Sequence, residues 1–201
     1  MNTPTTLRPM FPQTPTAMAA FTVAARFYSP AMLNHCLRSY LWGSTYAAKH
    51  GIAFDAELLY VAALLHDIGL TDPFDSHRIA FEEAGGELAW VFGVAAGWPT
   101  ERAARAAEII VLHMRDDVAP ADDAESHLLQ VATSWDVAGR HAEEFSMPTR
   151  TEILTRYPRL GFGDEFLACF ADQAVRKPES AAATSMRTNG AGRIKGNPLD
   201  R

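Results

Sequence analysis

Hydrophobic residues recur at three- and four-residue spacing through most of the chain, from about Thr16 to Val175. This spacing places them on one face of an α-helix. Proline, glycine, aspartate and serine separate the successive segments. No segment alternates strictly enough, or carries enough β-branched residues, to predict a strand. We therefore predict an all-α bundle, with helices near residues 16–27, 30–49, 56–68, 77–96, 100–114, 124–139, 149–156 and 163–176.

Local signals mark the ends of two of these helices. Ser29 precedes Pro30, which suits an N-cap followed by proline at the first helical position. Gly51 can adopt the left-handed conformation that ends the same helix. Asp55 can cap the next helix. The segment 56–68, AELLYVAALLHDI, is apolar almost all round, which predicts a helix buried inside the bundle.

The two ends of the chain lack this periodicity. Prolines interrupt residues 1–15, and small and polar residues dominate residues 178–201. Stretches of this kind cannot offset their ordering entropy by burial. We therefore expect a flexible N-terminus over residues 1–15, one domain over residues 16–177 and a disordered C-terminal tail over residues 178–201.

The motif LLHDIG places His66 and Asp67 side by side at the end of the buried helix. An ionised carboxylate in apolar surroundings needs a cation or several hydrogen-bond donors. For a bare His-Asp pair, a core histidine beside a capping aspartate is the simpler interpretation. Other histidine and aspartate residues of the chain favour a metal site instead.

Three further helices direct a histidine or aspartate inwards. His35 lies beside an apolar stripe, Asp136 lies on the inward face of the helix expected over 124–139, and His113 ends the helix expected over 100–114. Each of them alone is more often a satisfied core residue. Two imidazoles, of His35 and His66, and two carboxylates, of Asp67 and Asp136, form a mixed nitrogen and oxygen set, which suits Zn²⁺, Fe²⁺, Mn²⁺, Co²⁺ or Ni²⁺ better than Ca²⁺.

The order His35, then His66-Asp67, then Asp136 resembles the H…HD…D pattern of HD-domain metallohydrolases. The resemblance covers roughly residues 30–140. It implies a helical bundle with a five-helix core plus flanking helices. It also implies one divalent transition metal, with zinc the first choice, held by those four side chains and used to activate a bound water.

Within that superfamily, HCLRSYLWG from His35 and AELLYVAALLHDIGLT from Ala56 look most similar to the cyanamide hydratase-like branch. In two-metal HD proteins the segment matching FEEAGGELA begins with a histidine ligand, whereas this chain has Phe81 there. The resemblance therefore implies a mononuclear site. His113 matches a second-metal ligand of those proteins, so we assign it to a supporting or substrate-contacting role.

The reaction that this branch implies is hydration of a small nitrile, with cyanamide giving urea. A bound metal lowers the pKa of water and polarises the substrate. Besides Asp67 at the metal, His113 and Asp72 are candidates to relay a proton. For Asp72, in the sequence TDPF, a turn residue is the simpler interpretation.

An alternative function is phosphohydrolysis of nucleotides or other phosphate esters. It would use the same metal but needs cations that hold phosphate. Arg38, three residues after His35, is the best candidate, although the chain lacks a cluster of lysines and arginines. A second alternative is a non-catalytic HD module that binds a ligand, against which the intact set of four predicted ligands argues.

The composition limits the classes of partner that this protein can bind. The formal charge of −6, with lysine and arginine scattered, gives no basic surface for nucleic acid. No apolar run is long enough for a membrane span and the N-terminus does not read as a signal peptide, so we expect a cytoplasmic protein. Cys36 and Cys169 are expected as buried thiols rather than a disulfide. A small-molecule substrate fits this composition, and a homo-oligomer is compatible with it.

Overall fold

The computed structural model describes residues 11–115 and 118–200. This part of the chain contains helices and no strand, which confirms the all-α prediction. The α-helices are α1 (Pro15–Phe27), α2 (Pro30–His50), α3 (Ala56–Leu65), α4 (Phe81–Ala95), α5 (Thr100–Leu112), α6 (Ala124–Ala138), α7 (Met147–Arg156), α8 (Phe162–Arg176), α9 (Ala181–Arg187) and α10 (Gly190–Lys195). Short 3₁₀ helices are η1 (Ile68–Leu70), η2 (Ala142–Glu144) and η3 (Pro198–Asp200).

The predicted helix ends are confirmed. The Ser29 hydroxyl accepts a hydrogen bond from the Met32 amide, and Pro30 occupies the first turn of α2. Gly51 ends α2 with a φ angle of 67°, in the left-handed region where glycine has no steric penalty. Asp55 accepts from the Leu58 amide at the start of α3. Each cap satisfies a backbone group that would otherwise lack a helical partner.

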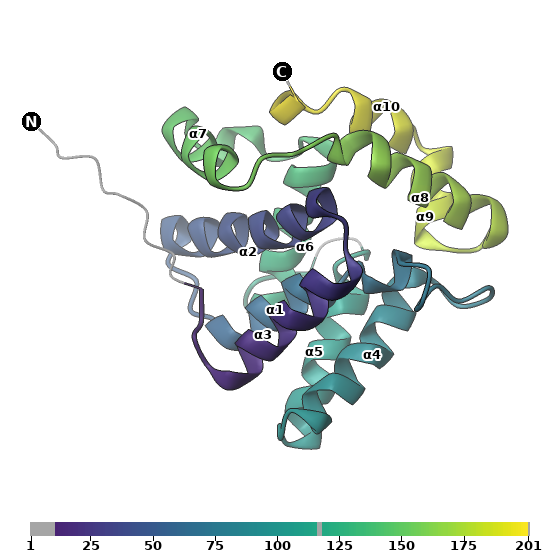
Figure 1. The fold of residues 1–201 in the computed structure, drawn as a ribbon. Coiled ribbons are helices and arrows are strands. Elements are labelled where there is room, and N and C mark those ends of the chain that lie inside the picture. The colour runs from purple at the N-terminus through teal and green to yellow at the C-terminus, as the bar shows by residue number, and fades with distance from the viewer. Residues whose placement is uncertain (1–10, 116–117, 201) are drawn as a thin grey trace, which may run out of the picture.

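The centre of the molecule is α3, as its all-round apolar sequence predicts. Residues 58–65 are all buried. Five other helices, α1, α2, α4, α5 and α6, pack against α3. Figure 1 shows α2 crossing above α1 and α3, with α4 and α5 extending as a pair below them. Helices α1 to α6 therefore form a helical core around α3.

The turn after α3 brings two backbones into close contact. The expected helix over residues 56–68 ends at Leu65 instead, and η1 follows it. A Cβ atom at Gly69 would lie 2.2 Å from the carbonyl oxygen of Phe81, at the start of α4. Gly69 thus allows η1 to lie directly against α4, which holds the His-Asp pair at the junction of three helices.

The C-terminal segment corrects one expectation. We expected residues 178–201 to be disordered, but residues 181–200 form α9, α10 and η3. Ala182 and Ala183 of α9 are buried, as are Ile194 and Leu199. This segment can be ordered because alanine loses almost no side-chain entropy on burial and can pack without a strong apolar pattern. Helices α9 and α10 pack on α8, and α10 also reaches α6.

Only part of the N-terminus that we predict to be flexible lies within the described residues. Residues 1–10 of the predicted flexible N-terminus lie outside the described residues. Phe11, the first described residue, packs with Tyr40 and Tyr60 at ring-centroid distances of 5.6 and 5.1 Å. From this residue onward the chain is therefore attached to the core.

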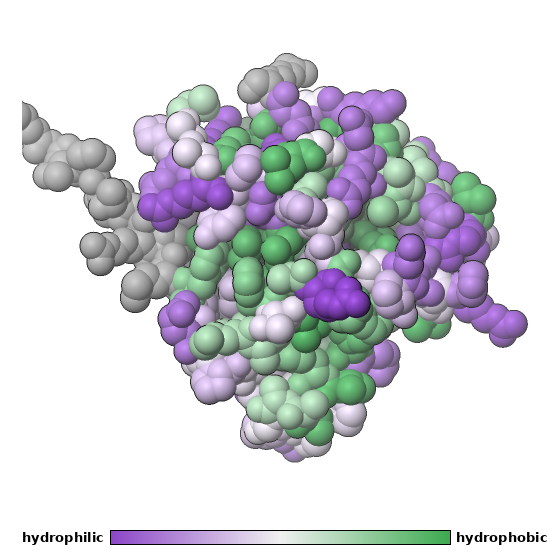
Figure 2. Space-filling view, in the orientation of Figure 1, coloured by the Kyte–Doolittle hydropathy of each residue, from purple (hydrophilic) through white to green (hydrophobic). Residues whose placement is uncertain are grey.

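Hydrophobicity is unevenly distributed over the surface. In Figure 2 the lower part of the molecule, over α1 and α4, is largely hydrophobic, and the upper part is more hydrophilic. Exposed apolar side chains include Met18 and Phe21 of α1 and Val91 of α4. No helix in residues 11–115 or 118–200 is long and apolar enough to span a membrane.

Candidate metal centre and its cavity

Three of the four predicted ligands converge in the core. His35 lies in the middle of α2, His66 follows the last residue of α3, and Asp67 begins the turn into η1. Nε2 of His35 lies 3.1 Å from Nε2 of His66, and Oδ2 of Asp67 lies 3.3 and 3.2 Å from these two nitrogens. All three side chains are buried. They form a group that could hold a metal ion.

The hydrogen bond at Nδ1 of each histidine indicates whether the opposite Nε2 atom carries a proton. Nδ1 of His66 donates to the carbonyl oxygen of Ala63 at 2.9 Å, and Nδ1 of His35 donates to Oδ2 of Asp136 at 2.7 Å. In the neutral imidazoles both Nε2 atoms then carry lone pairs. Oδ2 of Asp67 has no hydrogen-bond partner among the described residues. Three lone-pair atoms facing one another in the core form a site that a cation could occupy.

The electrostatics lead to the same conclusion. Burial lowers the pKa of His66, but the adjacent Asp67 carboxylate outweighs this effect and raises that pKa well above its usual value. Burial likewise disfavours ionised Asp67, yet His66 and His35 hold the pKa of Asp67 below its usual value. The group therefore attracts a positive charge, and a divalent metal supplies it without a proton. Two imidazole nitrogens and one carboxylate oxygen fit a transition metal.

His113 lies beside this group. It follows the last residue of α5, and its ring centroid is 4.9 Å from that of His66. Burial, reinforced by the nearby His66, lowers the pKa of His113 to about 3. Nδ1 of His113 donates to the carbonyl oxygen of Ile110. The ring is therefore neutral at physiological pH, with a free lone pair on Nε2.

Asp136 does not lie among the metal-ligand atoms, where the resemblance places it. Instead of joining the three ligand atoms, its carboxylate contacts the other nitrogen of the His35 ring. Arg38 donates to both oxygens, at 2.8 and 2.7 Å, and Trp42 donates its indole N–H to Oδ1 at 2.8 Å. Although burial opposes it, Arg38 and His35 hold the pKa of Asp136 well below its usual value. Asp136 therefore fixes the tautomer and the orientation of His35.

Arg38, expected to hold a substrate phosphate, and Asp72, expected to relay a proton, both lie away from the cavity. Arg38 is fully buried and its guanidinium is engaged by Asp136 and by the carbonyl oxygens of Tyr157 and Pro158. It therefore cannot hold a substrate phosphate. Asp72 is exposed in the turn after η1 and does not line the cavity described below. The simpler interpretation of Asp72 as a turn residue agrees with this location.

Sequence reasoning missed several residues that support the centre. The Phe162 ring stacks on His35 with centroids 4.3 Å apart and an interplanar angle of 13°. Arg159 and Asn197 both donate to the backbone carbonyl oxygen of Asp136 at 2.8 Å. Trp42 lies seven residues after His35 on α2, so its helical spacing could have indicated a shared face. No pattern in the sequence marks Arg159 or Asn197.

Phe81 occupies the position that the resemblance contrasts with a histidine ligand. It is buried, and its ring lies 6.0 Å from that of His113 and 5.7 Å from that of Phe170. A phenyl ring has no lone pair for a metal. This location is consistent with a single metal beside His66.

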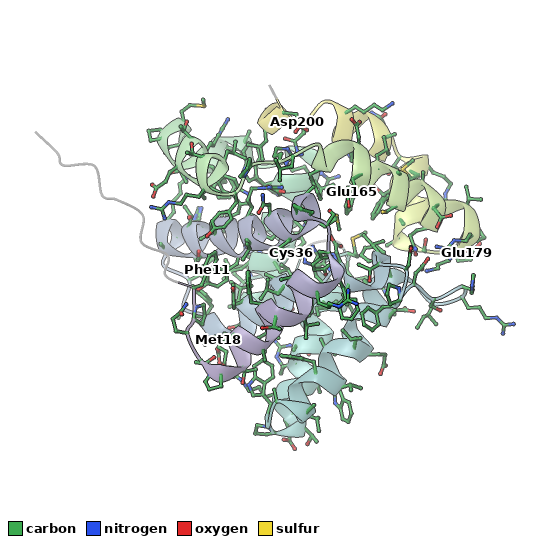
Figure 3. All side chains as sticks on the ribbon, in the orientation of Figure 1. Phe11, Met18, Cys36, Glu165, Glu179 and Asp200 are labelled. Atoms are coloured by element: carbon green, nitrogen blue, oxygen red, sulfur yellow. The ribbon has the colours of Figure 1, made fainter. Side chains whose placement is uncertain are left out.

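A cavity of about 390 Å³ leads outward from the centre. His35, His66, Asp67 and His113 form its inner end. Its walls come from α6 and α8, and from the C-terminal segment that we expected to be disordered. Figure 3 shows Cys36, which follows His35, in the middle of the molecule, and Glu179, which lines the outer cavity, near its edge.

The two cysteines are both free. Cys36 is buried, as predicted, whereas Cys169 is partly exposed. Neither belongs to the group that could hold a metal. The centre therefore depends on histidine and carboxylate ligands.

Comparison with known proteins agrees with this geometry. The family model of the HD domain matches residues 32–140. The cyanamide hydratases DDI2 and DDI3 of Saccharomyces cerevisiae are each 31% identical to this chain over 165 residues, which cover 80% of this chain and 71% of each relative. The matched region includes His35, the His66-Asp67 pair and Asp136. The chain therefore belongs to the HD-domain superfamily of metal-dependent hydrolases and hydratases, in its cyanamide hydratase-like branch.

Proposed function

We propose that this protein is a mononuclear, metal-dependent hydratase that adds water to a small nitrile-type substrate, with cyanamide giving urea. The observation that carries this proposal is the convergence of Nε2 of His35, Nε2 of His66 and Oδ2 of Asp67 at the inner end of a cavity. The similarity to two cyanamide hydratases supports the choice of substrate.

His35, His66 and Asp67 would hold the metal, and Zn²⁺ is our first choice. When bound, a divalent ion lowers the pKa of a water and polarises the electron-poor carbon of the substrate. Three protein ligands leave room for water and substrate, as in other catalytic zinc sites. Asp136 acts through His35, whose ring it orients through Nδ1.

His113 would position the attacking water. Its neutral Nε2 can accept a hydrogen bond, because Nδ1 already donates to Ile110. In the reaction the water oxygen bonds to the nitrile carbon, and both water protons end on the product. With a pKa of about 3, His113 suits the orientation of water better than the storage of a proton.

The alternatives are less well supported. Phosphohydrolysis was predicted to use Arg38, and the bonds of Arg38 to Asp136 remove it from the cavity. A module that only binds a ligand has no need for three converging ligand atoms and an adjacent neutral histidine. Water addition uses every buried polar residue of the inner cavity.

The experiment is a substrate panel on the purified, metal-loaded chain. Cyanamide and other small nitriles are compared with deoxynucleoside monophosphates and cyclic nucleotides. We expect urea from cyanamide, loss of this activity after chelation and its return with added Zn²⁺ or another divalent transition metal. Phosphate release without urea would overturn the proposal in favour of phosphohydrolysis. No turnover of any compound by stoichiometrically metal-loaded protein would favour a binding module.

A further inference from the structure

The cavity is much larger than cyanamide requires. Its volume is about 390 Å³. Cyanamide contains only one carbon and two nitrogens besides hydrogen, and displaces about as much volume as two waters, or roughly 60 Å³. The remaining space lies beyond the four residues of the metal centre. A substrate that fills it must extend well past its reacting group.

The cavity wall changes character from its inner to its outer end. Near the centre, Phe166 and Phe170 of α8 provide aromatic surfaces. Further out, the wall carries hydroxyl groups of the C-terminal segment, from Thr184, Ser185 and Thr188. Most of these outer residues are exposed or half-buried, whereas the inner ones are buried. The outer cavity therefore offers hydrogen bonds at the end open to solvent.

The charges of the outer wall are mainly positive. Arg140 follows the end of α6, and Arg193 lies in α10, which packs against α6. Arg193 donates to the carbonyl oxygen of Thr188, which holds its guanidinium at the cavity wall. Arg115 also lines the cavity, and Glu179 is the acidic residue of the outer wall. Guanidinium groups bind carboxylate and phosphate with paired hydrogen bonds.

We propose that the outer cavity binds an anionic substituent of the substrate, a carboxylate or a phosphate, through Arg140 and Arg193. This inference rests on the proposed function, because the reacting group of the same substrate lies at His35, His66 and Asp67. The substrate class thus extends beyond cyanamide to nitriles that carry a carboxylate or phosphate substituent. The hydroxyl groups of Thr184 and Ser185 can donate further hydrogen bonds to its oxygens, whereas the Thr188 hydroxyl already donates to backbone carbonyls of α9.

The test compares the metal-loaded wild type with the double variant Arg140→Gln and Arg193→Gln, at constant ionic strength. Arg156→Gln is the matched control, because Arg156 is exposed in α7, pairs with Glu152 and does not line the cavity. Binding of inorganic phosphate and of acetate is measured by calorimetry. Relative kcat/KM is measured for cyanoacetate against uncharged acetonitrile.

We expect the double variant to bind phosphate or acetate about 100-fold more weakly than wild type, since two arginines are lost and each lost bond to an ionised group is worth about ten-fold. The preference for cyanoacetate should fall similarly, and Arg156→Gln should change neither. The anion that loses more affinity identifies the substituent.

Unchanged binding of both anions would overturn the inference. Because anion binding is measured without turnover, this result remains distinct from failure of the proposed function. That failure would be the absence of nitrile hydration by the wild type.

Discussion

At the scale of single residues, the metal centre depends on which atoms carry protons. Nδ1 of His66 and Nδ1 of His35 both donate away from the centre, so in the neutral rings both Nε2 atoms present lone pairs towards Asp67. Neither imidazole can be replaced by a residue that only fills space. The group is therefore more sensitive to chemistry than to volume.

We predict that His66→Ala or Asp67→Ala abolishes stoichiometric metal binding while the chain stays helical. Each substitution removes one of three converging ligand atoms. Metal content is measured by elemental analysis and helicity by circular dichroism. His127→Ala is the control, because Nδ1 of His127 also bonds a backbone carbonyl, that of Val118, away from the centre. Full metal occupancy in both ligand variants would contradict the site.

Two neighbouring tryptophans provide a matched test of the support for His35. Trp42 donates to Oδ1 of Asp136, whereas Nε1 of the equally buried Trp135 has no partner among the described residues. We predict that Trp42→Phe weakens metal affinity about ten-fold or more, as is typical when a group that orients a ligand is lost. Trp135→Phe should leave metal affinity unchanged. Equal effects in a competition titration would show that only packing matters.

His113 should affect turnover and leave metal binding intact. We predict that His113→Ala lowers kcat for cyanamide about 100-fold or more, because the attacking water loses its acceptor. Metal content should remain at the wild-type level, since His113 is not one of the three ligands. Kinetics and elemental analysis on the same preparation check both parts. A variant with wild-type kcat would remove His113 from the reaction.

At the scale of elements, the junction between η1 and α4 places the His-Asp pair. We predict that Gly69→Ala lowers the free energy of unfolding by about 1–3 kcal/mol, because its Cβ would overlap the Phe81 carbonyl oxygen. Gly163→Ala is the control, since its Cβ would meet a side-chain atom of Asp200 at 3.2 Å. Urea unfolding of both variants measures the difference. A Gly69 variant as stable as wild type would mean that this junction relaxes freely.

The elements also show what periodicity can and cannot predict. Helices α1 to α8 carry large apolar residues at helical spacing, and all of them were predicted. Helices α9 and α10 escaped prediction because Ala182, Ala183 and Gly190 pack through small surfaces. At the centre, the adjacency of His66 and Asp67 indicated a metal. The contact of Asp136 with Nδ1 of His35 depends on side-chain positions set by Arg38 and Trp42, which spacing alone does not specify.

At the scale of the whole molecule, the buried carboxylate of Glu82 destabilises the folded state when it is ionised. Glu82 is 1% exposed, and its Oε2 has no partner among the described residues. Burial raises the pKa of Glu82 above its usual value. A raised pKa in the folded state stabilises the protein at low pH, and this contribution is lost as the pH rises through that pKa.

We therefore predict that Glu82→Gln makes the protein more stable than wild type at pH 7 and equally stable at about pH 4, close to the pKa of an unperturbed glutamate. Glu83→Gln, next to it and exposed, should change stability little at either pH. Urea unfolding at both pH values compares the three proteins. A stabilisation of the Glu82 variant that does not depend on pH would indicate a packing effect instead.

The Asp136 carbonyl joins distant parts of the chain, since Arg159 and Asn197 both donate to it. This has a consequence for synthesis on the ribosome. His35, His66 and Asp67 emerge early, whereas Asn197 emerges only after another 130 residues have been added to Asp67. A nascent chain therefore contains all three metal-binding side chains before Arg159 and Asn197 have been added. The support that the C-terminal segment gives to Asp136 is therefore the last part of the metal centre that the chain can complete.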